Sequence, residues 1–162
     1  MSAHFQKTSK HWDEFSGIRA ALAASGRCEP KILALLATET YFRSTIHRVL
    51  EYLYWIVIDA INPARADFIS LGISQAQVHH WRRAGIVSQT SLRISTLARF
   101  WNPFLNYDVC NFVLSTNMVN TENMAVILRA YTGRVTRYHL SVFAFFFQKA
   151  RRDVEVIRSC TL

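Results

Sequence analysis

The stretch ARADFISLGISQAQVHHWRRAG, residues 64–85, decides the fold, because it predicts two short helices joined by a glycine turn. Gly72 allows the positive φ of a tight turn, which a residue with a Cβ resists. Phe68 and Val78 stand four residues before and six residues after Gly72. A helix-turn-helix places apolar residues there to lock its helices together, and the Ser74 hydroxyl is expected to cap the second helix.

The second helix of this stretch is expected to end at Gly85 and to turn Ala76, Val78 and Trp81 toward the core. Amide, imidazole and guanidinium groups read base edges and hold phosphates, so its open faces predict DNA binding. Two short helices around a glycine also occur in helical proteins that never touch DNA. Base reading is assigned to Gln75, Gln77, His79 and His80, and phosphate contact to Arg82, Arg83, Arg93 and Arg99.

The charge is unevenly distributed along the chain. The formal net charge is +8, from 19 Lys and Arg against 11 Asp and Glu. Between Phe68 and Arg152 there are ten Lys and Arg but only two acids, Asp108 and Glu122, whereas the first 67 residues are nearly balanced. A basic second half is the electrostatic footprint of a polyanion binder, which favours nucleic acid as the partner.

The composition predicts an all-α, multi-helix domain. Half of the 162 residues are hydrophobic, and 5 Gly with 3 Pro leave long uninterrupted periodic runs. We expect an N-terminal helical extension over residues 1–30 and a helical DNA-binding and oligomerisation domain over 31–162. Long helices are expected near each end, over about 9–25 and 136–158.

A long helical run from about 31 to 61 is apolar on nearly all sides in its second half. Ile46, Val49, Leu50, Leu53, Val57 and Ala60 form one stripe at helical spacing. Tyr52, Trp55 and Ile56 make the other side apolar too, and these three are assigned to an oligomer interface. A helix that is apolar all round must be buried all round, either by a partner subunit or by the chain's own helices.

Patterns typical of enzymes and metal sites are missing from the sequence. There is no nucleophile elbow, Walker loop, dinucleotide fingerprint or zinc-protease motif. Cys28, Cys110 and Cys160 form no pair at ligand spacing, and His79 and His80 would diverge on a helix. We therefore expect a non-enzymatic protein without metal or cofactor. Reduced thiols and an apolar run of only 52–58 favour a cytoplasmic protein with no membrane association.

The elements LEYL at 50–53 and ARADFISLGIS at 64–74 resemble the FlhD family, the D subunit of the flagellar master transcription activator. The resemblance spans about residues 37–108. It implies an all-helical, dimerising subunit that joins an FlhC-like partner, binds promoter DNA and activates transcription. The C-type subunit carries a cysteine-rich zinc site, which this chain lacks. The chain is longer at both ends and more basic than that family.

The segment LGISQAQVHHWRRAGIVSQ also looks like Cro- and CII-type phage regulators. Both resemblances imply regulation through double-stranded DNA, and they differ in partner and assembly. The sequence therefore predicts a DNA-binding transcriptional regulator that acts as a homo-oligomer. The alternative is a helical interaction or assembly adaptor whose basic face meets an acidic protein or a membrane and not DNA.

Overall fold

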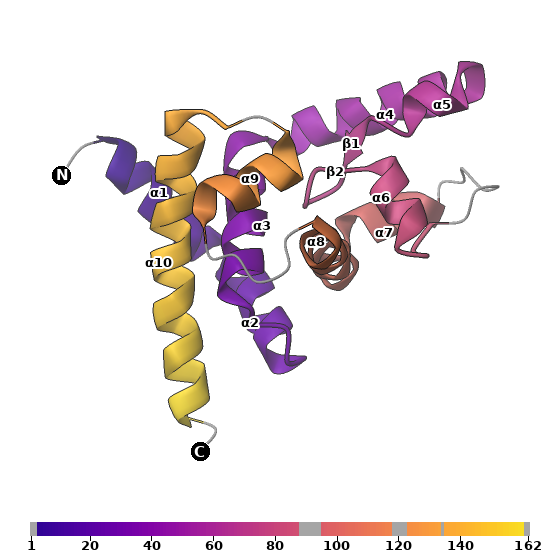
Figure 1. Cartoon of the computed structure of the whole chain (residues 1–162). Helices are drawn as coiled ribbons and strands as arrows, with labels where there is room; N and C mark the ends of the chain where they lie inside the picture. Colours follow the sequence, from indigo (N-terminus) through magenta and orange to yellow (C-terminus); the bar gives the residue numbers. More distant parts are fainter. Residues whose placement is uncertain (1–2, 88–94, 118–122, 134, 161–162) are drawn as a thin grey trace.

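The computed structural model describes residues 3–87, 95–117, 123–133 and 135–160, and nearly all regular structure within them is helical (Figure 1). The predicted all-α, multi-helix class is confirmed. None of the described helices combines the length and apolar character that a bilayer crossing needs. The elements in chain order are α1 (Ala3–Glu14), α2 (Ser16–Ala24), α3 (Pro30–Phe42), α4 (Thr45–Ile61), α5 (Pro63–Ala66), β1 (Ser70–Leu71), β2 (Ala76–Gln77), α6 (Val78–Arg83), α7 (Ser95–Trp101), α8 (Pro103–Asn117), α9 (Met124–Thr132) and α10 (Arg137–Cys160).

The first of two hydrophobic cores surrounds α3. Its residues 32–39 are buried without interruption, so this helix is enclosed on every side. Pro30 opens it at the first helical position, where a missing N–H costs little. The buried Thr38 hydroxyl donates a hydrogen bond to the Ala34 carbonyl oxygen at 2.7 Å. The long helix α10 packs along α3, with α1, α2, α8 and α9 completing the enclosure (Figure 1).

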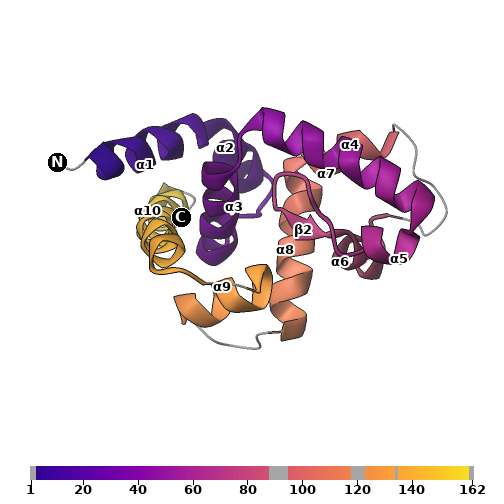
Figure 2. The same cartoon turned by 90° about the horizontal axis from the view of Figure 1, so that it is seen from above.

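The second core lies under α4, α5, the β1–β2 hairpin, α6 and α7. Trp55, Trp81 and Phe100 meet there, with the Phe100 ring centroid 5.4 Å from Trp55 and 5.0 Å from Trp81 in edge-to-face contacts. Helix α8 contributes residues to both cores. Figure 2 shows it between α3 on one side and the hairpin with α6 on the other. Cys110 faces the first core and Val109 faces the second.

Several helix limits differ from the expected ones for local reasons. The expected N-terminal helix is two helices, α1 and α2, separated at Phe15. The run from 31 to 61 breaks between Phe42 and Thr45, where the Ser44 hydroxyl caps α4 by accepting the His47 N–H at 3.3 Å. The residues of 104–115 do not show a pattern that separates helix from strand, and the structure places them in α8.

The limits of α9 rest on an asparagine and a glycine. The Asn123 side chain caps its start by accepting the N–H of Ala125 at 3.0 Å. The helix ends at Gly133, whose φ of 68° is one that glycine adopts without strain.

The turn of the β1–β2 hairpin is buried against the α7–α8 corner. Gly72 has φ at 79°, and a Cβ there would overlap the Phe100 carbonyl oxygen and stand 3.1 Å from Asn106 Oδ1. The next two amides are bound by the same corner: Ile73 N–H donates to Phe100 O at 3.1 Å, and Ser74 N–H donates to Asn106 Oδ1 at 2.8 Å. Any side chain at Gly72 therefore pushes the turn away from its two acceptors.

Replacing Gly72 by alanine is expected to lower the free energy of unfolding by roughly 3 kcal/mol or more, because strain at positive φ adds to an overlap with backbone. Gly26→Ala is the matched control, since Gly26 has φ at 77° with open space around it. Its expected loss is about 1 kcal/mol. Urea denaturation of both variants measures the difference, and equal losses would contradict the close approach at Gly72.

Candidate nucleic-acid interface

The predicted helix-turn-helix stretch forms a helix, a hairpin and a second helix. Helix α5 is a single turn, capped by Asn62 Oδ1, which accepts the Arg65 N–H at 3.2 Å. The antiparallel hairpin pairs Ser70 with Gln77 and Leu71 with Ala76, and α6 follows directly. The turn at Gly72 is present, but it joins two short strands and not two helices.

This hairpin changes the roles of two residues that the sequence assigned. Ser74 does not cap α6, because the helix begins four residues later at Val78. Phe68 does not lock the helices together: its side chain is 67% exposed and its ring packs on that of His79, with centroids 5.6 Å apart. Its place in the core is taken by Leu71, which is 1% exposed.

The inward face of α6 agrees with the sequence prediction. Ala76, Val78 and Trp81 are all buried in the second core. The Trp81 indole N–H donates to the Ala76 carbonyl oxygen at 3.2 Å, so this large side chain is both buried and hydrogen-bonded. Gly85 follows the helix with φ at 72°. These contacts fix which side of the short helix α6 faces outward.

Gln75 lies in the wrong place for base reading. It is 7% exposed and occupies the buried turn, where its Nε2 donates to the Gly72 carbonyl oxygen at 3.0 Å. Its φ of 53° is unusual for a residue with a side chain, and the surrounding turn enforces it. The assignment of Gln75 to base contact is therefore corrected: its side chain supports the hairpin from inside.

Arg82 is held by two carboxylates. Its Nε donates to Asp67 Oδ1 at 2.8 Å and its Nη2 to Asp59 Oδ1 at 3.4 Å, and 14% of the side chain is exposed. This arginine joins α6 to α4 and to the residue that follows α5. Its charge is largely neutralised inside the fold, so its main role is structural, which differs from the phosphate contact assigned from the sequence.

Most of the remaining assigned residues lie on the hairpin and α6, and Arg99 lies near the end of α6. Gln77, His79 and His80 are half-buried at the hairpin and α6, and Arg83 is exposed beside them. Arg99 is exposed on α7, and its Nη1 donates to the Ile86 carbonyl oxygen at 2.6 Å, which places it near the end of α6. Arg93 lies outside the described residues.

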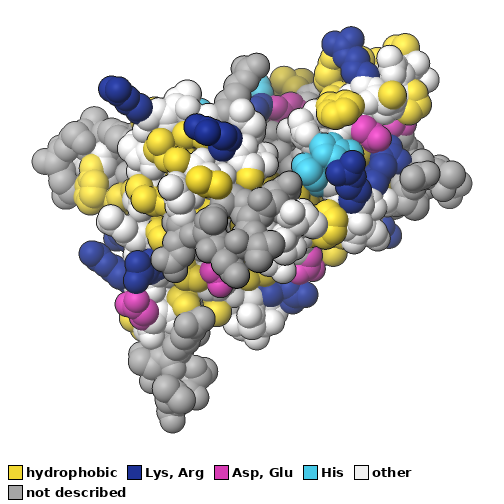
Figure 3. Space-filling view, viewed as in Figure 1, with side chains coloured by type: hydrophobic (Ala, Val, Ile, Leu, Met, Phe, Trp, Pro, Cys, Tyr) yellow, Lys and Arg dark blue, Asp and Glu magenta, His cyan; other side chains and the backbone are white. Residues whose placement is uncertain are grey.

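Two features make this surface a source of positive charge. Within the described part of the chain, Arg83 and Arg99 are exposed and form no ion pair with an acid. In Figure 3 the histidine surface lies directly beside a lysine and arginine surface, over the position of α6 in Figure 1. We call the surface formed by Gln77, His79, His80, Arg83 and Arg99 the α6 surface.

His80 contributes a neutral group to this region. Burial, reinforced by the neighbouring His79 and Arg83, lowers the pKa of His80 to about 4. The two histidine rings lie with centroids 3.8 Å apart. At neutral pH the His80 imidazole therefore offers a hydrogen-bond donor and an acceptor but no charge, which suits contact with a base edge better than contact with a phosphate.

A polar cavity of about 240 Å³ lies behind the hairpin. It is bounded by Gln75, Gln77 and His80 on one side and by Glu39 and Tyr131 on the other. Burial raises the pKa of the Glu39 carboxyl to about 7, and the nearby Arg43 and Arg48 oppose that rise. The only feature of the sequence that marks Glu39 is that it is the one acidic residue in the mostly apolar helix α3.

The two aromatic residues assigned to an oligomer interface are buried in the chain's own core. Tyr52 is 7% exposed and Trp55 is fully buried, and both pack against Phe100. The assignment of these two residues is corrected: they lie on the inner side of α4, which the second core covers. Ile56, the third residue assigned to the interface, is 37% exposed.

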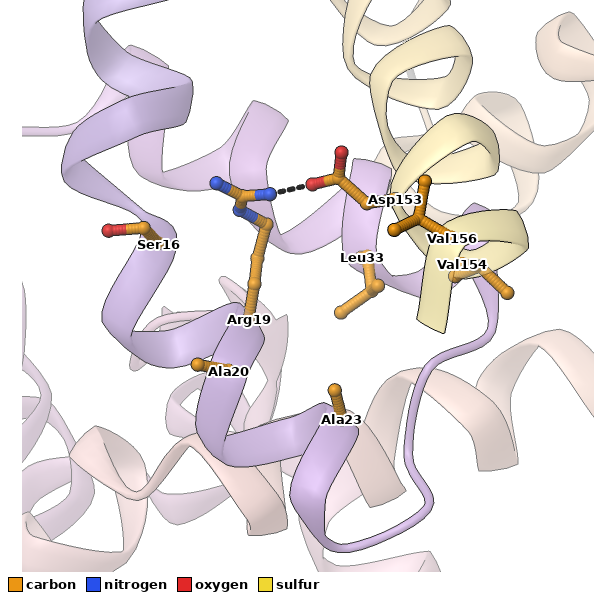
Figure 4. A pocket seen from close by; sticks show the side chains of 8 residues that line it. All are labelled: Ser16, Arg19, Ala20, Ala23, Leu33, Asp153, Val154 and Val156. Atoms are coloured by element: carbon orange, nitrogen blue, oxygen red, sulfur yellow. Dashed lines mark hydrogen bonds and ion pairs between the residues drawn. The ribbon is translucent and has the colours of Figure 1, made fainter. Parts of the chain in front are cut away.

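A second hollow, of about 300 Å³, lies between α2 and the end of α10 (Figure 4). Ala20, Ala23, Leu33 and Val154 are among its apolar lining residues, and Arg19 points to Asp153 across it. The Arg19 guanidinium also stacks over Trp12 at 4.2 Å. The positive charge of Arg19 is therefore already paired with Asp153 and Trp12 at the edge of the first core.

Neither a metal site within the described residues nor a similar protein indicates what the α6 surface binds. The described residues contain no group of three or more His, Cys, Asp or Glu side chains placed to hold a metal ion. Comparison of the chain with protein-family models, curated proteins and solved structures finds no match. The α6 surface is therefore interpreted from its own geometry and charge.

The raised pKa of Glu39 predicts a pH-dependent stability. Between pH 4.5, its ordinary pKa, and about 7, the folded chain keeps a proton that the unfolded chain has lost. The free energy of unfolding therefore falls as pH rises through this window and levels off above it. Glu39→Gln removes this contribution, so the variant is expected to be more stable than the wild type above pH 7, by on the order of 2–3 kcal/mol.

Urea denaturation at a series of pH values measures this difference. Glu14→Gln is the control, because Glu14 is an exposed acid on α1 and its variant should follow the wild-type curve. The lowered pKa of His80 has the opposite effect, because it makes the free energy of unfolding fall as pH falls from 6.5 toward 4. This contribution is the same in the wild type and both variants, so it cancels in the comparison. Parallel curves for wild type and Glu39→Gln would contradict a buried, proton-holding carboxyl.

Proposed function

We propose that the chain is a DNA-binding transcriptional regulator that contacts double-stranded DNA through the α6 surface. The observation that carries this proposal is two exposed arginines without acidic partners in the described residues, Arg83 on α6 and Arg99 near its end. His79 lies on the same helix and Gln77 directly precedes it, and the buried Val78 and Trp81 fix the orientation of that helix. Guanidinium groups hold phosphates, and amides and imidazoles contact base edges. A rigid support for such groups favours defined contacts over loose charge attraction.

The distribution of charge supports nucleic acid as the partner. The ten Lys and Arg between Phe68 and Arg152 face only two acids in the same span. Arg82 is the one α6 arginine that the fold uses internally, through Asp59 and Asp67. Phosphate contact is therefore assigned to Arg83 and Arg99, and base contact to Gln77, His79 and His80. The FlhD resemblance supports the same class of activity and implies a further, FlhC-like subunit at the promoter.

A helical interaction protein that does not bind DNA is the alternative function. The observation that favours it is the apolar outer side of α4, where Ile46 and Ile61 are 74% and 75% exposed. That surface and the α6 surface are separate in composition, since one is apolar and the other is basic. Both can therefore serve in one protein, and DNA binding is tested by itself.

The double variant Arg83→Ala/Arg99→Ala is expected to weaken binding to every DNA sequence. Loss of two phosphate contacts should lower the slope of log affinity against log salt by about 2. The control is Arg151→Ala/Arg152→Ala on α10, which removes the same charge from two exposed arginines elsewhere. Fluorescence anisotropy titrations at several salt concentrations measure both slopes. Equal effects of the two variants, or no salt-dependent binding by the wild type, would contradict the proposal.

Gln77 is expected to contribute to sequence preference and little to general affinity. After a preferred site is selected from random DNA, Gln77→Ala should lose about 1–3 kcal/mol of discrimination while its binding to random DNA stays the same. Gln148→Ala on α10 is the matched control, because it removes an exposed amide outside the α6 surface. Unchanged discrimination in Gln77→Ala would remove this residue from the base-contacting group.

A further inference from the structure

Helix α4 has two apolar sides, and the described part of the chain covers only one of them. The inner side carries Arg48, Tyr52 and Trp55, all buried. The other side, which we call the outer α4 face, carries large apolar residues that are between 37% and 75% exposed. They are Ile46, Val49, Leu50, Leu53, Tyr54, Ile56, Val57 and Ile61.

The spacing along this face is that of a helix that packs on another helix. Ile46, Leu50, Leu53, Val57 and Ala60 alternate steps of four and three residues, which keeps one seam of a helix facing a partner helix. The buried residues of α4 lie on the opposite side of the helix from this seam. The seam is therefore additional to the packing that already holds α4 in the second core.

The position of α4 leaves this seam accessible. The helix runs outward from the end of α3 and carries α5 at its far end (Figure 1). Hydrophobic surface is visible at that far end in Figure 3. The eight side chains together expose on the order of 700 Å² of surface, larger than the patch of a few hundred Å² usual on a monomer.

The chemistry of the outer α4 face selects the kind of partner. None of its eight residues carries a charge, and the nearest acids are engaged: Glu51 pairs with Arg43, and Asp59 pairs with Arg82. An acidic or basic protein, a nucleic acid or an anionic membrane would each need charged groups around this seam. A second apolar helix of the same length needs none, because burial alone drives such packing.

We propose that a second copy of this chain covers the outer α4 face with its own α4, which gives a two-fold symmetric homodimer. A symmetric interface uses the same patch twice, so the seam matches its partner in length and in apolar character. Complete burial of the outer α4 face would cover on the order of 700 Å² per copy, near the ~800 Å² per partner of a standard interface. Ile56 keeps the interface role that the sequence gave it, on the side of α4 opposite to Trp55.

This inference does not depend on DNA binding. If the α6 surface also binds DNA, the dimer presents two such surfaces related by two-fold symmetry, as paired half-sites of an operator require. The two proposals fail separately, because association through α4 is measured on the chain without DNA.

Sedimentation equilibrium of the full chain without DNA tests the proposal. The wild type is expected to have twice the mass of the single chain, reached at a plateau as concentration rises. Leu53→Glu places a carboxylate at the middle of the seam and is expected to weaken association by about 100-fold or more. Leu50→Glu, one helical turn away, is an independent second variant with the same expected result.

Val126→Glu is the matched control, because Val126 is 43% exposed on α9 and Leu53 is 52% exposed on α4. It adds the same charge outside the seam, and it is expected to stay dimeric. Far-UV circular dichroism confirms that each variant is folded. A wild type that stays monomeric, one that grows without a plateau, or seam variants as dimeric as the control would overturn the proposal.

Discussion

The backbone of Ser74 is the point on which the arrangement of this protein depends. Its N–H donates to the buried side chain of Asn106 on α8, and its carbonyl oxygen accepts the hydroxyl of Tyr131 on α9. Asn106 is itself held, because its Nδ2 donates to the carbonyl oxygens of Phe100 and Asn102. The hairpin turn is thus bound from both sides between two cores. Since Ser74 and Asn106 are both buried, losing one of them would leave the other unsatisfied at a cost of about 1–3 kcal/mol.

The position of this turn determines which charged side chains are paired inside the fold and which are exposed at the surface. The hairpin brings α6 close enough to α4 for Arg82 to reach Asp59 and Asp67, which neutralises that arginine inside the fold. Its neighbour Arg83 points away and stays exposed, near Arg99 of α7. The same turn places Gln75 inside and Gln77 at the surface. A difference of one or two residues in sequence therefore separates structural from surface roles.

Local patterns in the sequence predicted much of the fold, and long-range pairing explains most of what they missed. The helical class, the C-terminal helix, the end of α9 at Gly133 and the inward residues Val78 and Trp81 follow from periodicity and from glycine. The hairpin could not be read, because it depends on Asn106, 32 residues beyond Ser74. The role of Arg82 depends on acids 15 and 23 residues away. For α4, the sequence showed that both sides are apolar, but only packing shows that Trp55 faces the core.

Amide hydrogen exchange at single-residue resolution tests most directly whether the buried turn bound by Asn106 and Tyr131 sets the position of the α6 surface. The amides of Ile73 and Ser74 are in a turn, yet both are hydrogen-bonded within the core. We predict that they exchange only through global unfolding, as slowly as the amides of α3. Exchange at the rate of an ordinary surface loop would contradict the account, because it would mean that the hairpin opens independently of the two cores.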